Sequence, residues 1–304
     1  MQKVICLVAL ILVTLLSHAQ QTELKLTLEK GKTYKQVTQS VATIVQEVGG
    51  QKMTITAGIS GVMTFLVTGV SSSGYDMEVR YESLTMSMEL PQGKMEFSSE
   101  NESGSDIFSA ILREVINKPF TLTMTTSGKI TRVGDVDKLW DGAINQFSQL
   151  PQAQRDQIKA QLMNSYGENA LKGNIEMVTA VYPERPVRPG EKWTVNTDLK
   201  TGMSAKLDSE YEFQKVTADH IFMKGRSKIQ TDKEASVQSN GMAMTYNLSG
   251  IMITEIKANR KTGWIEEAKI SQEISGDAQI QDNPQVPGGM SIPMTMTTQM
   301  TISN

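Results

Sequence analysis

The side chains that could carry out acid–base, nucleophilic or metal chemistry are few in this sequence. There are two histidines, His18 and His220, and one cysteine, Cys6. A zinc site needs three or four His, Cys or carboxylate ligands, and a Ser-His-Asp triad would depend on His220. That residue ends the polar stretch 217–220, which has the character of an exposed turn. We therefore expect no metal site, no cofactor and no catalytic residue.

Clustered carboxylates are the other candidates for catalysis. Asp208, Glu210 and Glu212 alternate along one segment, and Glu266 and Glu267 are adjacent. Two carboxylates can act together in glycoside hydrolysis. The alternation of the first three is typical of the solvent face of a strand. A carboxylate-dependent hydrolase is therefore only a remote alternative.

Methionine is abundant, with 19 residues, and much of it recurs at strand spacing. Thioethers can bind Cu(I), but these methionines share their faces with Leu and Ile. Methionine also fills gaps in cores and lines adaptable apolar binding surfaces. Core packing and an apolar ligand groove both stay open as interpretations, and no single residue is assigned to ligand binding. The pairs at strand spacing are Met86/Met88, Met242/Met244 and Met294/Met296.

Alternating apolar and polar residues predict strands over much of the chain. In the region 24–97 they form runs joined by glycine-containing turns, such as Gly49-Gly50, which is typical of hairpins. Leu84, Met86 and Met88 fall on one face of such a run. One buried and one wet face indicate an antiparallel sheet.

Helical periodicity predicts three helices in the middle of the chain. The first covers about 105–117, with Asp106 as its N-cap. The second covers 136–147, with Asp135 as its cap, and a more polar third helix covers 152–166. Strands return after Gly173.

A proline-rich elbow at 182–193 precedes the C-terminal strands and should be stiff and extended. Its last residue, Trp193, could contribute to a recognition surface or anchor the core. Two motifs recur at similar places in the two β regions, which suggests two related halves. Gly31-Lys32-Thr33-Tyr34 is similar to Gly190-Glu191-Lys192-Trp193, and Thr126-Ser127-Gly128-Lys129-Ile130 is similar to Lys261-Thr262-Gly263-Trp264-Ile265.

The N-terminus has the features of an export signal. A basic start at Lys3 precedes an apolar run, 4–16, and Ser17-His18-Ala19 fits a cleavage site. Cleavage after Ala19 would remove the only cysteine. We expect a periplasmic, extracellular or other envelope location, with no transmembrane anchor in the mature chain. The expected division is a signal peptide at 1–19, an N-terminal β half at 20–134, a helical segment at 135–173 and a C-terminal β half at 174–304.

The order of these features resembles a domain-of-unknown-function family of exported Bacteroidetes proteins. The similarity rests on the signal ending Ala19-Gln20, the motif at 31–34, the stretch 120–133, the elbow motif at 186–193 and the stretch 259–265. The resemblance implies an envelope location and a β-rich fold, and it implies no activity and no site residues.

Together these features predict an α+β fold, predominantly antiparallel β, with two related curved β-sheet halves and a helical segment between or packed on them. Curved sheets that hold helices also suggest lipid carriers, by analogy of fold alone. The net charge is −3 and no basic block occurs, which argues against nucleic acid as a partner. We therefore expect a non-enzymatic envelope protein that binds an apolar ligand or a protein partner. The alternative is a structural or interaction module without a small ligand.

Overall fold

The computed structural model describes residues 21–101, 106–200, 203–239, 242–284 and 286–304, and these form one antiparallel sheet with four helices on one face. The predicted fold class, α+β dominated by antiparallel strands, is confirmed. The predicted signal peptide, with Cys6 and His18, lies outside the described residues. The strands are β1 (Thr33–Val48), β2 (Gln51–Val70), β3 (Gly74–Leu90), β4 (Gly93–Ser98), β5 (Phe120–Thr125), β6 (Ile130–Gly134), β7 (Lys192–Lys200), β8 (Ser204–Val216), β9 (His220–Thr231), β10 (Val237–Ser239), β11 (Met242–Asn259), β12 (Ile265–Ile280) and β13 (Met290–Ser303).

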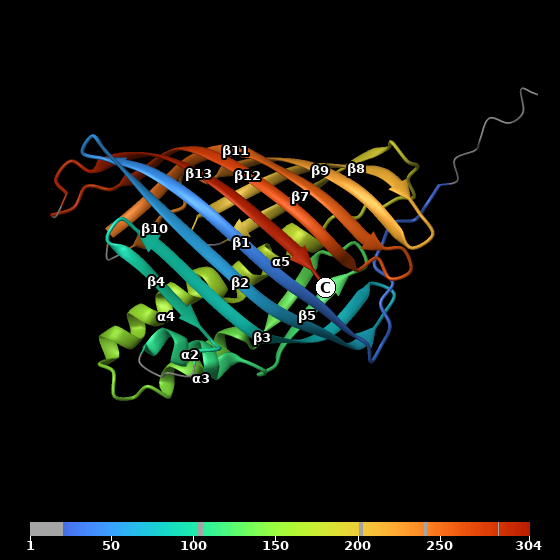
Figure 1. Cartoon of the computed structure of the whole chain (residues 1–304), viewed down its shortest axis with the longest axis horizontal. Helices are drawn as coiled ribbons and strands as arrows, with labels where there is room; N and C mark the ends of the chain where they lie inside the picture. Colours follow the sequence, from blue (N-terminus) through green and yellow to red (C-terminus); the bar gives the residue numbers. More distant parts are fainter. Residues whose placement is uncertain (1–20, 102–105, 201–202, 240–241, 285) are drawn as a thin grey trace, which may run out of the picture.

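The two predicted halves are joined in a single sheet. Its strand order is β6-β5-β3-β2-β1-β13-β12-β11-β9-β8-β7, with β4 beside β3 and β10 beside β11. The first and last strands pair along most of their length, from Val37 opposite Ser303 to Gln46 opposite Met294. The sheet arches over the helices, so one of its faces is turned toward them (Figure 1). We call this the inner face and the opposite one the outer face.

Hairpin chemistry and alternation explain most of the sheet. Gly49 and Gly50 form a two-residue loop between β1 and β2, and both have positive φ angles, 60° and 77°. This is the conformation that favours glycine in tight hairpins. Along β8, Leu207 and Phe213 are buried, whereas Asp208 is exposed. Because side chains alternate across a strand, the apolar residues reach the core on the inner face.

The helices are packed against the inner face and the ends of the sheet. They are α2 (Ile107–Val115), α3 (Val136–Asn145), α4 (Gln152–Tyr166) and α5 (Glu168–Thr179). The first three correspond to the predicted helices. The fourth was not predicted as a separate helix, and the expected boundary at residue 173 falls inside it. The division of the chain into segments stays a prediction.

Helix α5 has a special position because it contacts both edge strands of the sheet, β6 and β7. Gly173 allows this approach, since a β-carbon there would lie 3.1 Å from the carbonyl oxygen of Asp198 and 3.2 Å from the Cα of Leu199 on β7. The helix therefore spans the space between the two edges. Within the described ranges, no helix has both the length and the apolar character needed to cross a membrane.

The two predicted N-caps have different outcomes. Asp106 caps α2, because its Oδ1 accepts a hydrogen bond from the Ser109 amide at 2.6 Å. Asp135 occupies the N-cap position of α3 as predicted, but its side chain makes no capping hydrogen bond. Its backbone is left-handed, with φ of 67°, and its carboxylate instead pairs with Lys138 at 3.0 Å. The Lys138 ammonium lowers the pKa of Asp135, chiefly through this hydrogen bond.

Replacing Asp106 with alanine is expected to lower the free energy of unfolding by about 1 kcal/mol, because the first turn of α2 loses its side-chain acceptor. Asp106→Asn is the matched control and should retain most of the stability, since asparagine caps helices equally well. Urea unfolding followed by circular dichroism measures both. Equal losses for the two variants would contradict the capping role.

An extended N-terminal segment, residues 22–28, crosses one end of the sheet. The Leu26 amide donates to the Thr126 carbonyl at 2.8 Å, and the Thr27 amide donates to the Thr262 carbonyl at 2.7 Å. The segment also pairs with the elbow through Thr22 and Val187. It thus joins the turns of the two recurring motifs, 126–130 and 261–265, to the elbow. Its three leucines, Leu24, Leu26 and Leu28, are buried in the core.

Candidate functional site

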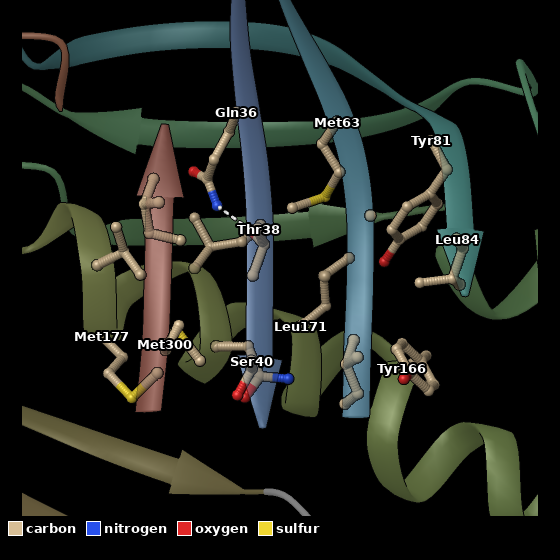
Figure 2. Close-up of a pocket in the computed structure, with 16 residues that line it drawn as sticks. Gln36, Thr38, Ser40, Met63, Tyr81, Leu84, Tyr166, Leu171, Met177 and Met300 are labelled. Atoms are coloured by element: carbon tan, nitrogen blue, oxygen red, sulfur yellow. Dashed lines mark hydrogen bonds between the residues drawn. The ribbon is translucent and has the colours of Figure 1, made fainter. Parts of the chain in front are cut away.

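A cavity of about 180 Å³ lies between the inner face of the sheet and the helices. Its walls come from the middle strands β1, β2, β3 and β13 and from α5 with the end of α4 (Figure 2). Engineered apolar cavities of about 150 Å³ are large enough to bind benzene. The lining residues are Gln36, Thr38, Ser40, Ile59, Gly61, Met63, Tyr81, Leu84, Tyr166, Leu171, Asn174, Ile175, Met177, Val178, Met300 and Ile302.

The strand register brings the cavity residues together. Gln36, Thr38 and Ser40 are at alternate positions of β1 and therefore share its inner face. Ser40 lies between Ile59 on β2 and Met300 on β13 in the pairing of the strands. Ile59 is 43% exposed and Asn174 on α5 is also exposed. The cavity therefore reaches the surface near Ser40, Ile59 and Asn174.

Three methionines from different elements line this cavity. Met63 is on β2, Met300 is on β13 and Met177 is on α5, and all three are half-buried. They face a common space (Figure 2). Thioether side chains are flexible and polarizable, so they adapt to apolar partners of different shapes. The interpretation of some methionines as groove-lining is therefore consistent with their placement.

Two tyrosines supply the main polar groups. Tyr81, on β3, is 4% exposed, and its hydroxyl points toward the middle of the cavity (Figure 2). Tyr166 is the last residue of α4. Among the described residues, neither hydroxyl has a protein hydrogen-bond partner. An unpaired polar group in an apolar space is unfavourable, so these hydroxyls are available to a ligand.

Both tyrosines are neutral at physiological pH. Burial, and secondly the nearby Tyr166, raise the pKa of Tyr81 above its ordinary value. Burial raises the pKa of Tyr166 to about 12. The third polar group is Gln36, whose Nε2 donates to the Thr38 Oγ1 at 3.3 Å. The polar part of the cavity therefore consists of uncharged hydroxyls and amides.

A second cavity, of about 220 Å³, adjoins the first at Tyr166, which lines both. It lies between β3 and β4 on one side and α2 and α4 on the other. Its lining residues are Met86, Ser87, Met88, Phe97, Phe108, Ile111, Leu112, Gln161, Leu162, Ser165 and Tyr166. No Asp, Glu, Lys, Arg or His is among the lining residues of either cavity.

The predicted methionine pairs are spread along the inner face. Met86 and Met88 line the second cavity. Met294 is 7% exposed and belongs to the buried core, and Met242, Met244 and Met296 are packed against that core. Met86/Met88 therefore line a cavity, whereas the other two pairs belong to the core or pack against it.

The predicted carboxylates lie away from the cavities. Asp208, Glu210 and Glu212 are outward-facing residues of β8, and Glu210 pairs with Lys192 at 2.8 Å. Glu266 pairs with His220 at 3.0 Å, and Glu267 pairs with Lys257 at 2.7 Å. In the part of the chain that the structure describes, no three His, Cys, Asp or Glu side chains gather as metal ligands would.

A larger hollow, of about 390 Å³, lies between strands β8, β9, β11 and β12. Its charged side chains are mostly paired at the surface, such as Lys224 with Glu255 at 3.5 Å and Lys257 with Glu267 at 2.7 Å. Exposed ion pairs of this kind contribute little energy. The hollow has a polar, solvated lining, so we regard the two inner cavities as the candidate site.

Trp193 is a core anchor. It is 9% exposed, its Nε1 donates to the Val181 carbonyl at 2.9 Å, and its ring stacks on Tyr211. Of the two interpretations of this residue, the structure supports the core anchor.

Sequence patterns did not predict a role for Gln36, Tyr81 or Tyr166. A change in the alternation of apolar residues could have identified Tyr81 as a cavity residue. Up to this residue the apolar side chains lie at odd positions: Tyr75, Met77, Val79 and Tyr81. After it they lie at even positions: Leu84, Met86 and Met88. This change of phase marks the irregularity where β3 pairs with β2 at Val62 and Met63. It places Tyr81 and Leu84 on the same inner face.

Comparisons with known proteins give one family and no activity. A family model described as a family of unknown function (DUF6263) matches residues 72–265, which is more than half of the chain. No curated protein matches the sequence. Among solved structures, the crystal structure of an outer membrane channel from Pseudomonas putida F1 is 8% identical, with 91% of this chain and 97% of that chain covered. Its TM-score is 0.24, at which the likeness carries no argument.

Proposed function

This chain belongs to the family of unknown function DUF6263, and we propose that it is an exported, non-enzymatic protein that binds an apolar ligand between its sheet and helices. The observation that carries the proposal is the pair of adjoining apolar cavities on the inner face. Ligand sites are typically concave and mostly apolar, with a few polar groups that fix orientation. Tyr81, Tyr166 and Gln36 are groups of that kind.

Export, and origin in the Bacteroidetes, form the part of the proposal that rests on sequence alone. The basic start, the apolar run and the small residues before Gln20 support cleavage after Ala19. The proposed location is the periplasm or another part of the cell envelope. Lipids and other poorly soluble molecules need a carrier or a receptor in such an aqueous compartment, which fits a protein with an apolar cavity.

Binding of the neutral fluorescent probe N-phenyl-1-naphthylamine tests this function. The wild-type protein should bind the probe with enhanced fluorescence, because the cavity is lined mainly by apolar side chains. The Ser40→Trp variant should reduce the affinity at least about tenfold, the equivalent of about 1.4 kcal/mol, because the indole would fill the opening between Ile59 and Met300.

Gln39→Trp is the matched control. Gln39 is the neighbour of Ser40 on β1 but is exposed on the outer face, so this variant should bind the probe as the wild type does. Absence of probe binding by the wild type would contradict the proposal. It would favour the alternative of an interaction module without a small ligand. Equal loss in both tryptophan variants would show that the probe binds elsewhere.

A further inference from the structure

The chemistry of the two cavities narrows the class of ligand. They combine apolar walls, two tyrosine hydroxyls without protein partners and no charged side chain. On the basis of the function proposed above, we infer that the ligand is an uncharged long-chain acyl ester, whose carbonyl oxygen accepts hydrogen bonds from Tyr81 and Tyr166 and whose chain occupies the apolar cavities.

The absence of cationic residues from the lining argues against a fatty-acid anion. A carboxylate needs a positive partner or several donors when it leaves water, because a buried charge without compensation is strongly unfavourable. Lys, Arg and His are missing from the lining residues of both cavities. An ester presents the same carbonyl geometry without the charge, so the neutral tyrosine hydroxyls are sufficient partners.

The hydroxyls favour an ester over a hydrocarbon. A tyrosine hydroxyl both donates and accepts hydrogen bonds. Tyr81 is 4% exposed and has no hydrogen-bond partner in the described protein. A purely apolar ligand would leave this hydroxyl unsatisfied, whereas a carbonyl oxygen would accept a hydrogen bond from it. Tyr166 lines the same cavity as Tyr81, so both tyrosines border the space that one polar group would occupy.

The shape of the space favours a long and narrow ligand. The cavities, of about 180 and 220 Å³, are each smaller than typical pockets for drug-sized molecules, which have about 300–1,000 Å³. Both are lined by Tyr166 and lie on either side of it. An acyl chain can use both, with its polar group at the tyrosines and its alkyl part among Met63, Met86 and Phe108.

Competition with bound N-phenyl-1-naphthylamine tests the inference with three ligands of equal chain length: methyl laurate, laurate at pH 8 and dodecane. Methyl laurate should displace the probe at roughly tenfold lower concentration than either of the others. Relative to dodecane, methyl laurate gains about one hydrogen bond to its carbonyl. Relative to laurate, it avoids the penalty for burying a carboxylate.

Tyrosine variants identify the groups responsible. Tyr81→Phe and Tyr166→Phe should each weaken methyl laurate binding about three- to tenfold, as expected for a lost neutral hydrogen bond. They should not weaken dodecane binding, because an alkane makes no hydrogen bond to either hydroxyl. Tyr34→Phe is the control, because the Tyr34 hydroxyl instead accepts from the Glu29 amide at 3.2 Å and Tyr34 is not among the cavity residues. That variant should bind all three ligands normally.

The outcomes separate this inference from the proposed function. If the wild type binds neither the probe nor dodecane, the proposed function itself fails. If the probe and dodecane bind, but laurate competes as well as its ester or the tyrosine variants bind the ester normally, only the choice of an acyl ester is overturned.

Discussion

Alanine in place of Gly128 is expected to lower the free energy of unfolding by about 2–5 kcal/mol, whereas alanine in place of Gly31 should lower it by only about 1–2 kcal/mol. The two glycines have nearly the same backbone conformation, with φ of 86° and 81°. They belong to the recurring motifs that suggested two related halves. The expected difference between them comes from their surroundings.

At Gly128 the chain passes directly beside the end of α5. A β-carbon there would overlap the carbonyl group of Thr179, whose hydroxyl donates to the Gly128 carbonyl at 2.7 Å. Alanine would combine an unfavourable positive φ, about 1–2 kcal/mol, with displacement of packed backbone, about 1–3 kcal/mol. Gly263 is in the same situation, since its β-carbon would overlap the backbone of Lys25. Gly263→Ala should therefore have a comparable effect.

Gly31 and Gly190 are the matched controls. Their φ angles are 81° and 88°, and a β-carbon at either position would have no other atom within 4 Å. Alanine at these positions would be destabilising only through the strain of a positive φ angle. Urea unfolding of the four single variants gives the comparison. Four similar losses would contradict the structure, because they would show that the close approach of the turns to 22–28 and α5 contributes nothing.

Sequence patterns were sufficient for the local structure. The Gly49-Gly50 hairpin, the alternation in β8 and the stripe that forms α2 follow from turn chemistry and from periods of 2 and 3.6 residues. These are interactions between residues near each other in the chain. The antiparallel class and the first three helices could therefore be predicted without knowledge of tertiary contacts.

Long-range pairing could not be predicted in the same way. The contact of β1 with β13 joins residues such as Thr38 and Ile302. The sequence of neither strand indicates which strand it pairs with. This pairing of β1 with β13 decides whether the two halves form two sheets or one. The position of Asp135 at the start of α3 could be predicted, but not its left-handed backbone or the pairing of its carboxylate with Lys138 in place of the helix amides.

The candidate site depends on this same tertiary pairing. Ser40, Ile59 and Met300 come from three strands, and they meet because β1 lies between β2 and β13. The sequence showed methionine-lined faces but could not show where a helix leaves part of such a face uncovered. That arrangement is set by α5 and by the end of α4, where Tyr166 lines both cavities.

Raising the pH above 10 is expected to destabilise the protein steeply, through three tyrosines that are nearly completely buried. Tyr81, Tyr182 and Tyr211 are 4%, 2% and 2% exposed. Burial raises the pKa of all three; for Tyr81, Tyr166 adds to this, and for Tyr211 the pKa rises to about 12. In the unfolded chain their pKa is about 10.

The sign of the effect follows from proton binding. Below pH 10 the tyrosines are protonated in both states, and their contribution to stability is fully present. Above pH 10 the unfolded chain loses these protons while the folded protein keeps them, so stability falls until the folded pKa values are passed. Each tyrosine contributes a slope of about 1.4 kcal/mol per pH unit, and three give about 4 kcal/mol per unit.

Urea unfolding at several pH values between 8 and about 11.5 measures this slope, and absorbance of tyrosinate at 295 nm shows when the groups ionise. Tyr211→Phe isolates one group, because it removes the Tyr211 hydroxyl with its hydrogen bond to Ser209 and keeps the ring that stacks on Trp193. The variant should reduce the alkaline slope by about 1.4 kcal/mol per pH unit and lower stability at pH 8 by about 1 kcal/mol, because the hydrogen bond to Ser209 is lost. An unchanged slope would show that Tyr211 ionises equally in both states. Lysines also titrate in this range, but they are identical in the two proteins, so the difference in slope belongs to the buried phenol.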